Sequence, residues 1–91
     1  MFASELKEIS MAVVNKEADK FTDTLLDIVT REMHRRAQSG HFNFSISLDS
    51  DIDVSEDVLD LAKDKLRNIL VDRGFVVVFR GKSFDVSWRG A

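Results

Sequence analysis

The stretch FASELKEISMAVVNKEADKFTDTLLDIVTREMHRRAQ, residues 2–38, contains no Pro and no Gly, and its apolar residues recur at helical spacing. They form two stripes: Phe2, Leu6, Ile9 and Val13, then Phe21, Leu25, Ile28, Val29 and Met33. One helix over this stretch would extend roughly 55 Å, whereas a compact domain of this size has a radius of gyration of only about 12 Å. We therefore expect the helix to overhang the body, so that its first stripe needs a partner.

The chain has 91 residues, a net charge of −3 and no Cys. This length predicts a single domain over residues 1–91 with a small core, and residues 1–15 are expected to be a helical extension used in oligomerisation. The absence of Cys excludes a disulfide scaffold or a Cys-based zinc site. The N-terminal residues are not typical of a signal peptide, and no apolar run is long enough to span a membrane. We expect a cytoplasmic protein without a membrane partner.

The remaining residues predict one strand, one helix and a hairpin. Residues 41–49 alternate as a strand with one apolar face. Ser55 is a helix N-cap, and Gly40 and Gly74 end the two helices as C-caps. Residues 75–80 and 83–89 are two strands joined by a turn at Gly81 and Lys82. The first helix is expected to break near Asn15, where the apolar stripe changes phase.

These elements predict a two-layer α+β fold of the order α-β-α-β-β, with a three-stranded mixed sheet packed on helices. The strand over residues 75–80, apolar on both faces, is expected at the centre of the sheet. It would run parallel to the strand over residues 41–49 through a right-handed crossover. The predicted core comprises Leu25, Ile28, Val29, Phe44, Ile46, Leu48, Leu59, Leu66, Ile69, Phe75, Val77, Phe79, Val86 and Trp88.

The second face of the sheet would be open. It would show small polar side chains around Val76 and Val78, on the strand expected to be central. We expect these two valines to contribute to an interface, together with the N-terminal stripe of Phe2, Leu6, Ile9 and Val13.

Basic residues are unevenly distributed, which is a clue to association surfaces. Arginines that converge on a cleft between subunits would bind a phosphate-like anion, whereas dispersed arginines would only be solvated. The candidate ligand-binding residues are Arg31, Arg35, Arg36, Arg80, Lys82 and Arg89.

Other chemistry has weak support in the sequence. Asp49, Asp51 and Asp53 have the spacing of a calcium loop, but Val54 stands where the turn needs Gly. An acidic loop leading into a capped helix explains them better. The two histidines lack nearby carboxylates for a metal site. No catalytic motif, metal site or cofactor motif is present, so we expect no enzyme, no metal and no cofactor.

Nucleic acid is not an expected partner. The terminal hairpin resembles the wing of a winged helix, but no helix-turn-helix precedes it. The helix that precedes it is rich in Asp, and the net charge is negative.

Two glycine-ended helices, the second ending Arg73-Gly74-Phe75, and a hairpin closing with Ser87-Trp88 resemble small accessory proteins encoded by bacteriophages. The resemblance implies a compact, often oligomeric viral protein that binds a host protein or a small ligand. The expected function is that of a non-enzymatic homo-oligomeric binding protein, an inhibitor of or adaptor to a partner protein. The alternative is an oligomer that sequesters a nucleotide-like anion through clustered arginines.

Overall fold

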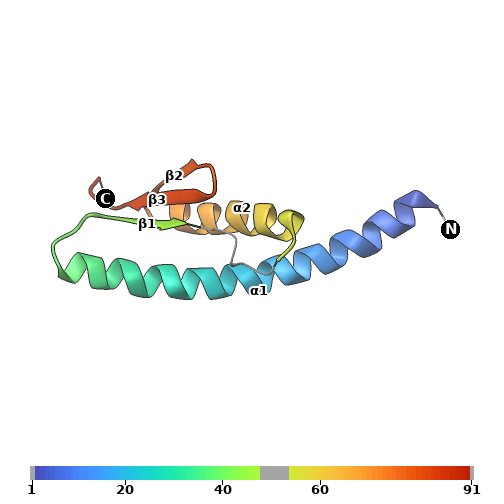
Figure 1. Cartoon of the computed structure of the whole chain (residues 1–91), viewed down its shortest axis with the longest axis horizontal. Coiled ribbons are helices and arrows are strands. Elements are labelled where there is room, and N and C mark those ends of the chain that lie inside the picture. Colours follow the sequence, from blue (N-terminus) through green and yellow to red (C-terminus); the bar gives the residue numbers. More distant parts are fainter. Residues whose placement is uncertain (1, 48–53, 91) are drawn as a thin grey trace.

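The computed structural model describes residues 2–47 and 54–90 of the chain. Its elements in chain order are α1 (Ala3–Gln38), β1 (Asn43–Ser47), α2 (Glu56–Asp72), β2 (Val76–Arg80) and β3 (Ser83–Ser87). Helix α1 runs the length of the molecule, and α2 and the strands lie along its C-terminal part (Figure 1). The α+β class and the long N-terminal helix are confirmed.

The helix ends follow from the caps that the sequence predicts. The Ser55 hydroxyl accepts a hydrogen bond from the Val58 amide at 3.3 Å and begins α2. Gly74, with φ of 93°, ends it, and the Phe75 amide donates to the Leu70 carbonyl at 3.0 Å. Gly40 ends α1 in the same way. A non-glycine residue is strained at such a φ, which is why both helices stop at glycine.

Helix α1 is continuous from Ala3 to Gln38, so the break expected near Asn15 does not occur. Val13 and Val14 lower helix propensity by only a few tenths of a kcal/mol each, and no Pro or Gly interrupts the stretch. At this point the apolar residues move to another side of the helix, and the helix itself continues.

The sheet corrects the predicted strand order. The order is β1-β3-β2 and both pairs are antiparallel, so the expectation of a mixed sheet centred on residues 75–80 is wrong. Strands β1 and β2 run in the same direction, as predicted, but β3 lies between them. Central position suits β3 because Phe84 and Val86 are its fully buried inward side chains. On its other face, Asp85 bonds to Ser45 of β1 and pairs with Arg80 of β2.

The main core lies between α1, α2 and the inner face of the sheet. Of the predicted core, four residues are buried, namely Leu25, Val29, Leu66 and Val86. A further seven pack against them while partly buried, namely Phe44, Ile46, Leu59, Phe75, Val77, Phe79 and Trp88. Ile69 is half-buried as well. Leu48 lies outside the described residues.

Ile28 is exposed, so its assignment to the core is wrong: it lies on α1 beyond the edge of the stripe that faces α2. The prediction also omitted the buried residues Met33, Leu70 and Phe84.

A second cluster lies where α2 begins. Ala18 of α1 is fully buried against Val58 and Ala62 of α2. The Thr22 hydroxyl donates to the Ala62 carbonyl at 3.5 Å, which satisfies the only buried polar side chain among the described residues. Small side chains let the two helices approach closely here. This cluster is the N-terminal limit of the packed body, and only Val14 extends it further along α1.

Candidate interaction site

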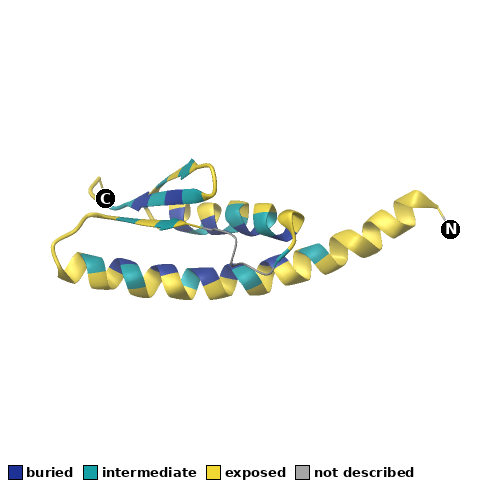
Figure 2. Ribbon diagram, viewed as in Figure 1, coloured by how far each residue is buried: buried dark blue, intermediate teal, exposed yellow. Residues whose placement is uncertain are grey.

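The N-terminal part of α1 projects from the body as a free arm. Every residue from 2 to 13 is exposed (Figure 2). The molecule measures 57 × 27 × 21 Å along its principal axes, and the arm accounts for its elongation (Figure 1). Four large apolar side chains on the arm form what we call the arm stripe: Phe2, 75% exposed, Leu6, 53%, Ile9, 58%, and Val13, 52%. The predicted overhang is therefore present.

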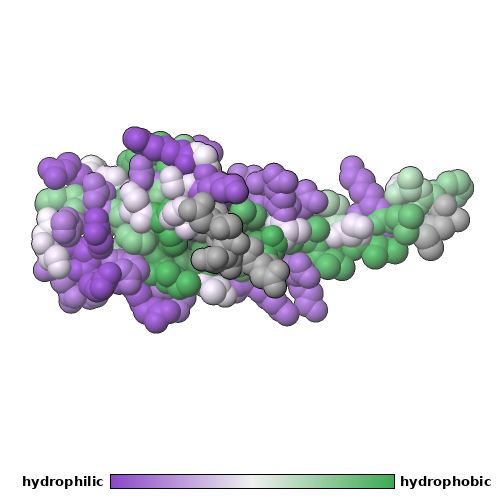
Figure 3. Space-filling view, in the orientation of Figure 1, coloured by the Kyte–Doolittle hydropathy of each residue, from purple (hydrophilic) through white to green (hydrophobic). Residues whose placement is uncertain are grey.

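The arm stripe faces away from the body. At ~100° per residue, its four side chains occupy a sector of roughly 60° on the helix surface. The buried side chains Ala18, Leu25 and Val29 occupy a sector on the opposite side of α1. In the continuous helix α1, the chain's own core therefore does not cover the arm stripe. Figure 3 shows apolar side chains running along the projecting end.

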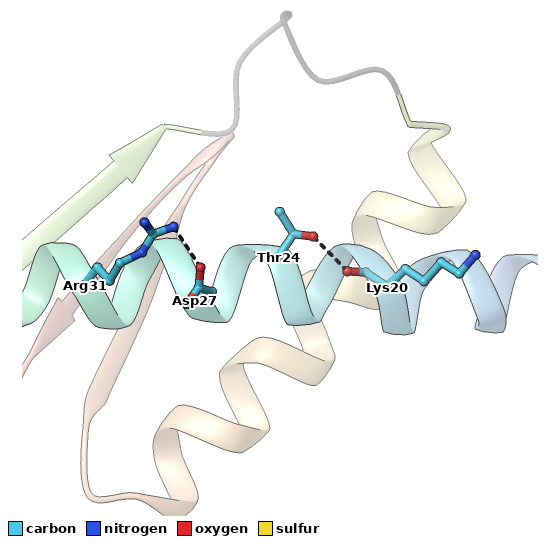
Figure 4. Close-up of polar contacts among 4 residues, drawn as sticks. All are labelled: Lys20, Thr24, Asp27 and Arg31. Carbon is cyan, nitrogen blue, oxygen red and sulfur yellow. Dashed lines mark hydrogen bonds and ion pairs between the residues drawn. The ribbon is translucent and has the colours of Figure 1, made fainter.

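The face of α1 that carries the arm stripe becomes polar after Val13. Lys20, Thr24, Asp27 and Arg31 follow on this face beside the body (Figure 4). Arg31 Nη2 pairs with Asp27 Oδ2 at 2.7 Å, and both side chains are mostly exposed. Thr24 Oγ1 donates to the Lys20 carbonyl at 3.1 Å. On this face of α1, the apolar surface is thus confined to the arm and ends after Val13.

Three of the six predicted ligand-binding cations lie near the C-terminal end of α1, each with a local partner. Arg31 pairs with Asp27, as described above. Arg35 Nη2 lies 2.6 Å from Glu32 Oε2. Arg36 Nε donates to the Asn43 carbonyl at 3.3 Å. The exposed ion pairs contribute at most about 1 kcal/mol each to stability.

The other three cations are divided between the two ends of the sheet. Arg89 lies over the Phe42 ring at 4.4 Å, at the end of the sheet next to Arg36. Arg80 pairs with Asp85 at 3.2 Å and belongs, with exposed Lys82, to the hairpin turn at the other end. The six cations therefore do not converge within one chain.

A shallow hollow that the sequence did not reveal lies between α1, the end of α2 and the sheet. It has a volume of about 360 Å³, and Met33, Phe75 and Trp88 supply its apolar wall. The rings of Phe75 and Trp88 meet edge to face with centroids 6.4 Å apart. His34 and Arg73 also line it, and none of the six predicted cations does. Three separate segments build this hollow, so only the fold brings its residues together.

The open face of the sheet exposes the two predicted valines, but not on a central strand. Val76 is 56% exposed and Val78 45% exposed, on the edge strand β2. They lie opposite Ser87 and Asp85 of β3, respectively. Because β2 is an edge strand, the two valines lie at the border of this face and not at its centre. Their predicted role in an interface stays a prediction.

We expect Val78→Lys to keep the stability of the native domain and Val77→Lys to unfold it. Residue 78 faces solvent opposite Asp85, where a Lys would form a favourable cross-strand pair. The half-buried Val77 packs against the core one residue earlier, where a Lys would place an unpaired charge in an apolar environment. Thermal unfolding followed by circular dichroism checks this, and equal melting temperatures would mean that the two faces of β2 are assigned wrongly.

Within residues 2–47 and 54–90, no group of three or more His, Cys, Asp or Glu side chains is arranged to hold a metal ion. The candidate calcium ligands Asp49, Asp51 and Asp53 lie outside these ranges. Across the same two ranges, no helix combines the length and apolar character needed to cross a membrane.

No protein-family model, curated protein or solved structure matches this chain. The resemblance to phage accessory proteins stays a prediction.

Proposed function

We propose that this chain is a non-enzymatic, homo-oligomeric binding protein that acts as an inhibitor of, or an adaptor to, a partner protein. The observation that supports this proposal is the arm stripe, which is exposed and faces away from the buried side of α1. Burying its four side chains would contribute on the order of 6–10 kcal/mol before ordering costs. Contacts of this kind hold subunits together and leave the sheet face and the hollow free for a partner.

The alternative function, binding of a nucleotide-like anion, requires several subunits. Because the six cations are dispersed and locally paired in one chain, a phosphate site would have to combine arginines of different protomers. Native mass spectrometry of protein purified from its own host tests both functions in one measurement. A homo-oligomer that carries a partner protein supports the proposal, whereas a homo-oligomer that carries only a small ligand supports the alternative.

The double variant Leu6→Glu, Ile9→Glu is expected to be monomeric. Each Leu or Ile contributes roughly 1.5–3 kcal/mol when buried, and the new carboxylates would be buried without partners. We expect a dissociation constant for self-association at least about 100-fold higher than that of the unaltered chain. Light scattering at micromolar concentration measures the change.

Met11→Glu is the matched control for this double variant. Met11 is 43% exposed on the same arm, but it lies on the opposite side of the helix from the arm stripe. It should keep the oligomeric mass of the unaltered chain. A mass of 10.4 kDa for the unaltered chain, or equal loss of assembly in Met11→Glu, would contradict the proposal.

A further inference from the structure

The spacing within the arm stripe has the symmetry of a self-pairing helix. Phe2, Leu6, Ile9 and Val13 are separated by four, three and four residues, which is the spacing of alternating a and d positions in a coiled coil. These intervals are the same whether they are counted from Phe2 or from Val13. Two antiparallel copies therefore match layer by layer around a two-fold axis, as an isologous contact requires.

We propose that the arm stripe pairs with the arm stripe of a second copy of this chain in an antiparallel contact. In this contact Phe2 lies opposite Val13 of the partner subunit, and Leu6 lies opposite Ile9 of the partner subunit. The inference rests on the proposed function and deepens it, because it names the occupant of the arm stripe and the direction in which that occupant runs.

The side chains that flank the arm stripe suit a close pair of helices. Ala3, Ser10 and Ala12 occupy flanking positions, and Glu5 is the single charged residue among the flanking positions from 3 to 12. In the antiparallel contact, Ala3 lies beside Ser10 of the partner subunit, and Glu5 lies beside Ala12 of the partner subunit. No like charges meet, and small side chains let the two backbones approach.

The residues that follow the arm stripe determine the direction of the pair. The a and d positions continue through Lys16, Lys20, Asp23 and Asp27, and all four are exposed. A parallel pair would place each of these charges beside its own copy, in four successive layers. In the antiparallel pair they lie beyond Phe2 of the partner subunit, and none of them lies beside its own copy.

The placement of the body permits the same arrangement. Each body packs on the side of α1 opposite to the arm stripe, and only from Val14 onward. In the antiparallel contact the two bodies therefore lie at opposite ends of the paired arms and do not collide.

Disulfide trapping tests the direction directly, since the chain contains no Cys of its own. We would prepare Phe2→Cys and Val13→Cys as two single variants and oxidise each alone and as an equimolar mixture. Both positions are exposed on the arm, so the body keeps its fold. In the antiparallel contact, two copies of Cys at the same position lie roughly 16 Å apart along the helices, beyond the reach of a disulfide. The mixture should then give the linked heterodimer in at least about tenfold higher yield than either sample alone.

The other outcomes separate this inference from the proposed function. Efficient linking of Phe2→Cys to itself would show a parallel pair, which overturns the antiparallel contact but leaves a homo-oligomer. An oligomeric mass without linking in any sample would place the subunit contact elsewhere and overturn it too. A monomeric unaltered chain, or a complex in native mass spectrometry that holds a single copy of this chain with a different protein, would overturn both the antiparallel contact and self-association.

Discussion

Replacing Phe84 by alanine is expected to remove most of the free energy of unfolding of the domain. Phe84 is 1% exposed, and it is the largest of the fully buried side chains. It lies in the central strand β3, with its ring 5.6 Å from that of Phe79. A Phe→Ala change at such a site costs about 3–5 kcal/mol, because the cavity left behind collapses only in part. Small domains have a free energy of unfolding near the low end of the ~5–15 kcal/mol range, so this loss takes most of it.

Phe79→Ala is the matched control, because it removes the same side chain from the edge strand β2. Phe79 is only partly buried, so its removal leaves a site that water can enter. We expect it to cost at least about 1 kcal/mol less than Phe84→Ala. Urea unfolding followed by circular dichroism compares the two variants. Equal midpoints would show that the core is not centred on β3.

The local elements could be predicted because short-range signals specify them. Ser55 and the two C-cap glycines fix helix ends through hydrogen bonds within a few residues. The alternation in residues 83–87 likewise fixes which face of that strand is buried. None of these signals depends on a distant part of the chain.

The strand order could not be predicted because it depends on pairing between distant segments. Residues 75–80 are apolar on both faces, which is typical of a central strand, whereas β3 carries the charged residue Asp85. The structure places Asp85 on the open face, where Ser45 and Arg80 from the two flanking strands bond to it. A charged residue satisfied from both sides is compatible with a central strand, and local patterns do not show those partners.

The candidate site likewise has one part that local sequence predicts and another that depends on the fold. The arm stripe follows from the length of α1 and the phase of its apolar residues, which are both local properties. Whether Arg36 and Arg80 meet depends on the fold, and they lie at opposite ends of the sheet. The hollow beside Phe75 and Trp88 also needs the packed fold before it exists.

Thr24→Pro is expected to destabilise the domain by about 3 kcal/mol or more. Proline at this position removes the amide donor to the Lys20 carbonyl and places its ring against that carbonyl. Thr24 is exposed, so the change removes no core contact. On either side of it, however, Thr22 and Leu25 are buried. A kink in α1 must therefore pull one of them out of the core. Circular dichroism during thermal unfolding measures the loss.

Two controls separate the backbone effect from the side chain and from the arm. Thr24→Ala loses only the bond from the hydroxyl to the Lys20 carbonyl, and it should match or exceed the unaltered stability because Ala favours helix. Asn15→Pro introduces the same backbone defect at the root of the arm, where every residue from 2 to 13 is exposed. At residue 15 a kink lets the arm reorient without unpacking the core, so Asn15→Pro should cost clearly less than Thr24→Pro.

All three changes are made in the chain that also carries Leu6→Glu and Ile9→Glu, so that differences in oligomeric state do not affect the measured stability. Equal losses would mean that the arm stabilises the body of its own chain, which would leave less of its apolar surface for a partner.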